Sequence, residues 1–329
     1  MSEHTYRAVV CERLGPPESL SVQPLPREPL APGSIRMEVR AAGLNFPDVL
    51  MIRGAYQHKP AMPFVPGLEV AGVVLEAGAG VRHFAIGDAV MAQLATGGYA
   101  EEVVTEASKI QPLPANFSFA EGAAFLVAHI TAYHALKTRA VLAPGQTLLV
   151  LGAAGGVGLA AVQVGKALGA RVIAAASSPD KLKAAAASGA DDLVDYRKEP
   201  VENAVKRITR NRGADVLLDP VGIAQEAALR CLAWDGKLLV TGFAAGTIPS
   251  YAANRVLLKG ASVIGVRAGE ASRHDPELRQ REMAELLALA EEGKVRPHVS
   301  VEIPLDRFAE AMGLLSERRA IGRVALTTG

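Results

Sequence analysis

Residues Leu148 to Gly165 read LLVLGAAGGVGLAAVQVG, an apolar run with most of its glycines at the centre. A membrane-spanning helix would need about 18 apolar residues, and this run only just reaches that length. Glycine weakens the interior of a helix, so the central glycines favour a strand, a tight turn and a helix. We therefore expect the turn Gly152–Gly158, GAAGGVG, to follow a buried strand and to open a helix.

The sequence around this turn alternates between short apolar runs and Ala-, Lys- and Glu-rich helical stretches such as Pro179–Ser188 and Pro200–Arg210. Strands that alternate with helices indicate βαβ units and a parallel sheet covered on both faces. Six strands are expected, the number in a complete Rossmann domain, a doubly wound α/β fold. The predicted strands are Leu148–Leu151, Arg171–Ala176, Asp192–Asp195, Asp215–Leu218, Lys237–Thr241 and Ala261–Val266.

The first 125 residues have a different pattern, with proline or glycine every few positions. Alternating strands such as Ile35–Ala41 and Val70–Ala77, with a turn at Gly87–Asp88, predict a twisted, mainly β domain with long loops. After Val266 the pattern is helical again. One helix should carry an apolar face and end at Gly293, and a second should start at Asp306. The apolar face comprises Met283, Leu286, Leu287 and Ala290.

Composition narrows the functional classes. Half of the 329 residues are hydrophobic and 21% are charged, which is typical of a globular protein of about two domains. The net charge of +1 argues against a nucleic-acid partner. Cys11 and Cys231 lie far apart and predict neither a disulfide framework nor a zinc site. The start has no signal-peptide pattern, so we expect a cytoplasmic protein without a membrane span.

The glycine turn predicts a phosphate site. A tight glycine turn lets the backbone approach a pyrophosphate, whose negative charge the helix N-terminus favours. The match to G-x-G-x-x-G is imperfect, because Ala153 occupies the place of the first glycine. The alternative is a turn that only packs a helix on a sheet, but its place in a six-strand unit favours the nucleotide. The expected contacts are Ala154, Gly155, Gly156, Val157 and Gly158.

The end of the second predicted strand bears on the choice of cofactor. NAD sites commonly place Asp or Glu there to bind the ribose 2′-hydroxyl, but here Ser177, Ser178 and Lys181 follow. A lysine and two hydroxyls suit a 2′-phosphate. Two charge-assisted hydrogen bonds would favour NADPH over NADH by roughly 10²–10⁴-fold. Ser177 and Ser178 could also cap the helix that starts at Pro179, and both functions are compatible.

The whole chain resembles the medium-chain dehydrogenase/reductases, and among them the zinc-free quinone oxidoreductase (zeta-crystallin-like) branch. The matching stretches are AAGLNFPDVLMIRGAY (Ala41–Tyr56), PFVPGLEVAGVV (Pro63–Val74), GAAGGVGLAAVQ (Gly152–Gln163), KALGARVIAAASSPDK (Lys166–Lys181) and DLVDYR (Asp192–Arg197). The resemblance implies a Rossmann domain, residues 127–266, inserted in a GroES-like catalytic domain. That catalytic domain would comprise residues 1–126 and 267–329.

The resemblance also implies that no metal binds. In zinc alcohol dehydrogenases of this superfamily, the places of Asn45, Leu68 and Val127 carry the catalytic zinc ligands. Zinc needs Cys, His or carboxylate ligands from about three positions, and only Glu69 remains in this region. We therefore expect Glu69 to be a buried structural carboxylate, held by backbone amides or a cation.

Without zinc, a proton source and a polarised acceptor must come from side chains. Asn45 and Asp48 lie three residues apart at a predicted helix start, and Tyr56 follows in a loop. The resemblance implies that these three line the substrate pocket beside the nicotinamide. Tyr56 matches the proposed proton donor of related 2-enoyl thioester reductases, and a phenol is protonated at neutral pH. The alternatives are that Asp48 only caps the helix and Tyr56 only packs in the loop.

The resemblance assigns further cofactor contacts. Asn45 and Thr131 would lie near the nicotinamide, and Tyr196 beside the adenosine. The segment after the fifth strand and the end of the sixth would contact the nicotinamide half. These last residues are Gly242, Phe243, Ala244 and Val266.

The expected function is NADPH-dependent, zinc-independent hydride transfer to quinones or electron-poor alkenes. Two alternatives stay open: a 2-enoyl thioester (enoyl-CoA or enoyl-ACP) reductase, and a non-catalytic, crystallin-like NADPH-binding protein. A homodimer is expected, because the resemblance implies pairing of the sixth strand, Ala261–Val266, with its twin across a two-fold axis.

Overall fold

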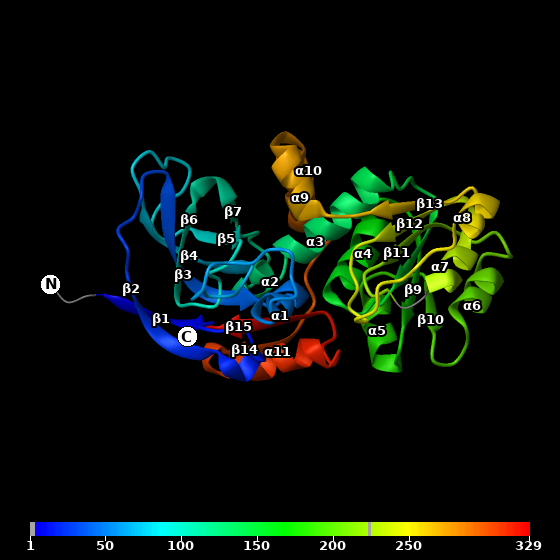
Figure 1. The fold of residues 1–329 in the computed structure, drawn as a ribbon. Coiled ribbons are helices and arrows are strands. Elements are labelled where there is room, and N and C mark those ends of the chain that lie inside the picture. The colour runs from blue at the N-terminus through cyan, green and yellow to red at the C-terminus, as the bar shows by residue number, and fades with distance from the viewer. Residues whose placement is uncertain (1–3, 223–224) are drawn as a thin grey trace. The chain divides into compact units, whose positions relative to one another are not determined.

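The computed structural model describes residues 4–222 and 225–329 and divides the chain into two compact units. The first, here called the β unit, comprises Met1–Val127 and Pro297–Gly329. The second, the Rossmann unit, is Ala128–Arg296. Figure 1 shows the helices and strands of both units with their labels.

The Rossmann unit is built on a six-stranded parallel sheet in the order β10-β9-β8-β11-β12-β13. Numbered along the chain, this order is 3-2-1-4-5-6, that of the Rossmann fold. The strands are β8 (Thr147–Leu151), β9 (Arg171–Ala176), β10 (Asp192–Asp195), β11 (Ala214–Asp219), β12 (Leu232–Val240) and β13 (Ser262–Gly265). The predicted fold and its six strands are confirmed. β12 starts earlier than predicted, because buried Leu232 already pairs with Ala214 before a register shift.

Helices cover this sheet and begin where the sequence supplies caps. Ser178 accepts a hydrogen bond from the Lys181 amide at the start of α5, and Pro179 takes the first helical position. The helices of the unit are α4 (Gly156–Ala167), α5 (Pro179–Ala187), α6 (Val201–Ile208), α7 (Gln225–Cys231), α8 (Ala253–Lys259), α9 (Ala268–His274) and α10 (Pro276–Glu291). α3 (Leu126–Tyr133) begins in the β unit, enters the Rossmann unit and continues as a π-helix, η3 (His134–Arg139).

The β unit contains a seven-stranded sheet, ordered β14-β15-β3-β4-β5-β7 with β6 also paired to β3, and a separate ladder of β1 and β2. Its strands are β1 (Thr5–Val10), β2 (Ser21–Pro26), β3 (Ser34–Gly43), β4 (Glu69–Ala77), β5 (Ala89–Gln93), β6 (Glu102–Glu106), β7 (Ile110–Pro112), β14 (Val299–Pro304) and β15 (Arg323–Thr327). Its helices are η1 (Pro17–Ser19), α1 (Phe46–Ile52), η2 (Ala107–Lys109), α2 (Phe119–Ala123), η4 (Leu305–Arg307) and α11 (Phe308–Ser316). β15 pairs with β3, so the end of the chain completes the sheet begun near its start.

The second passage between the units differs from the predicted boundary at residue 266. α9 and α10 belong to the Rossmann unit, and the chain returns to the β unit only after Arg296. Polar side chains tie α10 to the helical segment that starts the unit. His134 Nδ1 lies 2.8 Å from Glu282 Oε1, and the Tyr133 hydroxyl donates to Glu285. The predicted apolar face of α10 is buried at Met283, Leu286 and Ala290, but an apolar face does not reveal which unit it covers.

The apolar run Leu148–Gly165 forms β8, the glycine turn and the first part of α4. In residues 4–222 and 225–329, no helix combines the length and the apolar character needed to cross a membrane.

Candidate active site and cofactor site

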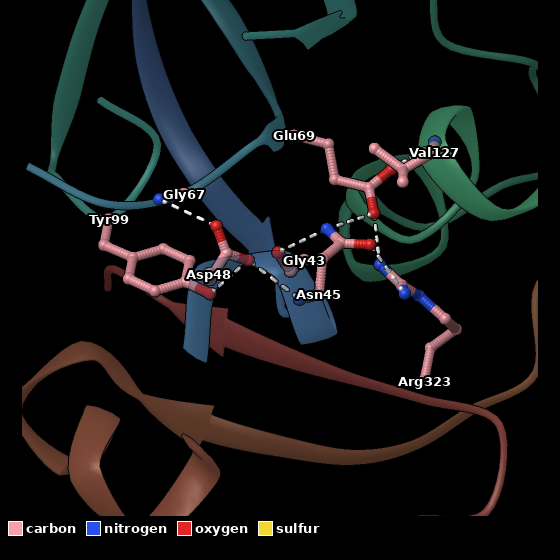
Figure 2. A network of polar contacts seen from close by, with 8 residues as sticks. All are labelled: Gly43, Asn45, Asp48, Gly67, Glu69, Tyr99, Val127 and Arg323. Atoms are coloured by element: carbon pink, nitrogen blue, oxygen red, sulfur yellow. Dashed lines mark hydrogen bonds and ion pairs between the residues drawn. The ribbon is translucent and has the colours of Figure 1, made fainter. Parts of the chain in front are cut away.

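Glu69, the first residue of β4, is fully buried and lies at the centre of a polar network in the β unit (Figure 2). Its Oε2 accepts a hydrogen bond of 2.9 Å from the Val127 amide, and its Oε1 contacts the guanidinium of Arg323. Burial raises the pKa of Glu69, whereas the Arg323 charge and the hydrogen bonds oppose that rise. The first amides of a helix lack partners within it, and an anion stabilises that end. Glu69 therefore caps α3, and the prediction of a buried carboxylate held by a backbone amide and a cation is confirmed.

Asn45 is locked by the same network. Its Nδ2 donates to Glu69 Oε1 at 2.9 Å and to the Gly43 carbonyl at 3.3 Å, and its Oδ1 accepts from Arg323 Nη1 at 2.9 Å. Both protons of the amide are used, so its orientation is determined by its partners. The remaining lone pair of Oδ1 can serve only a hydrogen-bond donor such as a hydroxyl.

Asp48 is fully buried and accepts three hydrogen bonds. Its Oδ2 accepts from the Asn45 amide at 2.8 Å and from the Tyr99 hydroxyl at 2.9 Å, and its Oδ1 from the Gly67 amide at 3.2 Å (Figure 2). Burial raises the pKa of Asp48 to about 7, which the Tyr99 hydrogen bond partly opposes. These contacts make Asp48 a group that positions Asn45 and the start of α1, as the helix-cap alternative predicts. Tyr56 is half-buried and packs against the hydrophobic core of the β unit.

The three places that correspond to zinc ligands gather around Glu69. Asn45 and Val127 both contact its carboxylate, and Leu68 precedes it in the chain. The positive charge at this place is the guanidinium of Arg323. Across the part of the chain that the structure describes, no three His, Cys, Asp or Glu side chains come together in a way that could hold a metal ion.

The glycine turn in the Rossmann unit has the geometry of a phosphate cradle. Gly152 has φ +58°, in the left-handed region, and α4 begins at Gly156 with Gly155 as its N-cap. A Cβ at Gly158 would lie 2.3 Å from the Gly152 carbonyl oxygen, so only glycine fits there. A Cβ at Gly155 would meet nothing closer than 3.5 Å, which leaves the backbone open on that side. The turn and the start of a helix of 12 residues therefore fit a pyrophosphate.

Buried polar atoms mark the same edge of the sheet. Asp219 ends β11, Thr241 follows β12, and Tyr251 lies in the segment after Thr241. Within the described residues, Asp219 Oδ2, Thr241 Oγ1 and the Tyr251 hydroxyl are buried without hydrogen-bond partners. Such groups cost free energy unless a water or ligand satisfies them. In open α/β sheets, ligands bind at the carboxyl ends of the strands, so these atoms fit a polar cofactor.

The segment after β9 was expected to cap α5 and to bind the 2′-phosphate of NADPH, and its geometry is compatible with both functions. Ser178 Oγ caps α5, so the capping role is confirmed. Lys181 Nζ lies 3.5 Å from Ser177 Oγ, which places a cation beside a hydroxyl at the end of β9.

The structure brings most of the predicted cofactor residues to one edge of one sheet. The glycine turn follows β8, Ser177 follows β9, and Tyr196 follows β10. Gly242–Ala244 lie shortly after β12, and Val266 follows β13 and donates its amide to the Val240 carbonyl at 2.9 Å. Thr131 belongs to the Rossmann unit through α3. Asn45, Asp48 and Tyr56 belong to the β unit.

Three residues of this network, Tyr99, Gly67 and Arg323, were not predicted from the sequence. The sequence does mark Arg323, because it is the only charged residue in the apolar run IGRVAL (Ile321–Leu326). In the same way, Glu69 is the only charged residue in FVPGLEVAG (Phe64–Gly72). Two lone, opposite charges within apolar stretches are expected to pair if both stretches are buried.

Known proteins that resemble this chain match nearly all of it. Residues 31–115 match the family described as alcohol dehydrogenase GroES-like domain, and residues 156–292 match zinc-binding dehydrogenase. A quinone oxidoreductase-like protein 2 homolog from Nematostella vectensis is 38% identical over 98% of this chain and 89% of its own. The crystal structure of Escherichia coli quinone oxidoreductase complexed with NADPH has a TM-score of 0.89 at 30% identity, covering 98% of this chain and 99% of that one. The quinone oxidoreductase of Thermus thermophilus, also studied with NADPH, has a TM-score of 0.84 at 35% identity, with coverage of 98% and 99%.

Proposed function

The chain belongs to the medium-chain dehydrogenase/reductase superfamily, in its quinone oxidoreductase branch, and from that premise we propose that it is an NADPH-dependent, zinc-independent reductase of quinones or electron-poor alkenes. The observation that carries the proposal is the contact of Arg323 with both Glu69 and Asn45. A guanidinium supplies the positive charge at the place where zinc-binding relatives hold a metal. A bound nicotinamide cofactor would supply the hydride.

The residues of the β unit then have separate roles. The one lone pair left on Asn45 Oδ1 accepts from a hydroxyl of the cofactor or substrate, in an orientation fixed by Glu69 and Arg323. Asp48 and Tyr99 hold the amide of Asn45 and the start of α1. Tyr56 donates the proton where the substrate is an alkene.

NADPH is proposed over NADH for a reason of charge. Lys181 and Ser177 stand where an NAD site would carry a carboxylate. The relatives solved with NADPH, from Escherichia coli and Thermus thermophilus, support the same choice.

Two other functions are compatible with the same fold. An enoyl thioester reductase would use Tyr56 in the same way and would differ in the surface that receives the thioester's carrier. A crystallin-like protein would bind NADPH without turnover. The presence of Asn45, Asp48 and Tyr56 favours an enzyme, because a storage role does not need these side chains.

The deciding experiment is a panel of NADPH oxidation assays with quinones, enones and enoyl thioesters, run with and without a strong zinc chelator. We expect turnover with at least one class and no effect of the chelator. NADPH binding without turnover by any acceptor would favour the crystallin-like role. Loss of activity on chelation, with one equivalent of zinc per chain beforehand, would contradict the proposal.

We further propose a cytoplasmic homodimer, assembled through the Rossmann unit. β13 is the last strand of its sheet, and large apolar side chains are exposed near it. Val263 lies on β13, Leu257 and Leu258 lie on α8, and Trp234 lies against Gly260. An open strand edge flanked by apolar side chains is a natural surface for a second copy.

A further inference from the structure

One side chain contacts both segments through which the chain passes between its two units. The passages lie after Val127 and after Arg296. Gln163, on α4, lies within hydrogen-bonding distance of His129, two residues beyond the first passage, and of Arg296, immediately before the second.

The geometry of these contacts is specific. Gln163 Nε2 donates to the Arg296 carbonyl at 2.8 Å, and the Arg296 amide donates to Gln163 Oε1 at 2.9 Å. This two-point contact determines the orientation of the amide. His129 Nε2 lies 3.1 Å from the same Oε1. Because an amide oxygen only accepts, His129 must carry a proton on Nε2.

Gln163 belongs to the helix that the glycine turn opens. It lies seven residues after Gly156, the first residue of α4, so a rigid helical segment of about 10 Å joins the two. The same contact reaches α3, in which Thr131 lies two residues beyond His129. One amide therefore connects the proposed pyrophosphate helix, the helix that carries Thr131, and the exit segment.

In the β unit, hydrogen bonds anchor the residue that lies on the other side of each passage. Glu69 binds the Val127 amide, and Glu69 also binds Arg323. The backbone amide of Arg323 donates to the His298 carbonyl at 2.8 Å. Between its two anchors, each passage therefore leaves one residue, Ala128 in the first and Pro297 in the second.

We propose that Gln163 is a positioning residue for hydride transfer: it fixes α3, which carries Thr131, and the exit segment at Arg296 to α4, the helix that the proposed cofactor-binding glycine turn opens. This inference rests on the proposed function. Hydride transfer depends steeply on the placement of donor and acceptor, and a misplacement of about 1 Å can cost about 10²-fold. Cofactor affinity depends on contacts that Gln163 does not make.

The test compares the wild-type enzyme with Gln163→Leu, which keeps the bulk of the side chain and removes every hydrogen bond. We expect kcat with the best acceptor to fall about 10- to 100-fold, while the acceptor KM and the NADPH Kd, measured by fluorescence titration, stay within about threefold. Gln146→Leu is the matched control. Its Oε1 accepts from the Ala143 amide at 2.9 Å, which contacts neither passage.

A second readout does not require turnover. Hydrogen exchange in the peptide that contains Arg296 should become about tenfold faster in Gln163→Leu, because one hydrogen bond to this amide is lost. NADPH should slow that exchange in the wild type but not in the variant. Gln163→Glu, which keeps the acceptor and loses the donor, should lie between the two and is the alternative variant if Gln163→Leu does not fold.

Three outcomes would overturn the inference. If kcat is unchanged in Gln163→Leu while hydrogen exchange at Arg296 is faster, Gln163 stabilises the structure and does not position groups for hydride transfer. A parallel loss of NADPH affinity and kcat would place its effect in the cofactor site. Equal slowing of exchange by NADPH in the wild type and in Gln163→Leu would show that α4 does not act on the passages. If the wild type reduces no acceptor, the proposed function fails, and the exchange experiment still tests Gln163.

Discussion

Arg323 and Glu69 form an ion pair inside the β unit, although 254 residues separate them in the sequence. Glu69 is fully buried and Arg323 nearly so. A buried charge is costly unless it is paired, so each side chain makes the burial of the other possible. The pair also joins the last strand of the chain to the start of α3.

The first prediction concerns this pair. Arg323→Met should lower the free energy of unfolding by about 3–5 kcal/mol, because Glu69 would remain buried without its partner. The double variant with Glu69→Gln should recover much of that loss, since no unpaired charge remains. Urea unfolding measures both. Arg7→Met, which breaks exposed pairs with Glu101 at 2.7 Å and Asp306 at 3.1 Å, is the control and should cost at most about 1 kcal/mol. Equal losses in Arg323→Met and Arg7→Met would refute the argument.

The second prediction concerns pH. Burial raises the pKa of Asp48 from 3.8 in the unfolded chain to about 7 in the folded protein. The folded state therefore holds this proton more tightly than the unfolded state does. The stabilisation is complete below about pH 4 and is lost as the pH rises to about 7. Wild-type protein should therefore lose stability between pH 5 and 7 relative to Asp48→Asn, which has no such proton. Parallel unfolding free energies across this range would show that Asp48 stays ionised.

The third prediction concerns cofactor choice. Lys181→Ala should weaken NADPH binding by about 1.5–3 kcal/mol, the usual contribution of a charge-assisted hydrogen bond, and should leave NADH binding almost unchanged. Fluorescence titration with both cofactors measures this. Lys183→Ala, on the exposed side of the same helix α5, controls for a general loss of positive charge. If Lys181→Ala weakens both cofactors equally, Lys181 does not bind the 2′-phosphate.

The fourth prediction concerns Tyr56. If its hydroxyl protonates a reduced alkene, Tyr56→Phe should lower kcat by about 10²–10⁴-fold with enones or enoyl thioesters. NADPH affinity should persist because the ring remains. Quinone reduction should change little, because a reduced quinone oxygen can take its proton from water. Tyr6→Phe, in β1, is the control for loss of a phenol. If kcat of Tyr56→Phe is unchanged with every acceptor, Tyr56 only lines the pocket and does not donate the proton.

The fifth prediction concerns assembly. Wild-type protein should sediment at about twice the chain mass of 34.4 kDa, and Val263→Lys should shift it towards the monomer. A charge on β13 would oppose pairing with a second copy. Leu193→Lys, on β10 at the opposite edge of the sheet and with similar exposure, is the control and should stay dimeric. A wild-type mass near 34.4 kDa at micromolar concentration would contradict the dimer.

The Rossmann unit was predictable because its signals are local. An apolar run, a glycine turn and a cap such as Ser178 each act within a few residues, and their alternation determines the sheet. The site in the β unit was only half predictable. The sequence marked Asn45, Asp48 and Glu69. Of their partners, Arg323 is marked only as a lone cation in an apolar run and Tyr99 is not marked at all, because both come from distant segments that tertiary pairing brings together.

The end of the Rossmann unit was not predictable for a related reason. α9 and α10 follow the sixth strand, and their amphipathic pattern reports only that one face is buried. Their place depends on side chains such as Glu282 and Glu285, whose partners lie about 150 residues earlier. No local pattern encodes such a contact.

The cap that Glu69 places on α3 limits how this protein can be recombined with its relatives. A chimera spliced between Val127 and Ala128 would join two parents within the first turn of α3, with the capping carboxylate from one parent and the helix body from the other. A crossover at the loop before Ser118, the N-cap of α2, would keep α3 whole but would still separate it from Glu69. The nucleotide-binding part can therefore be exchanged without loss of this cap only between parents that both have a carboxylate at Glu69 and an arginine at Arg323.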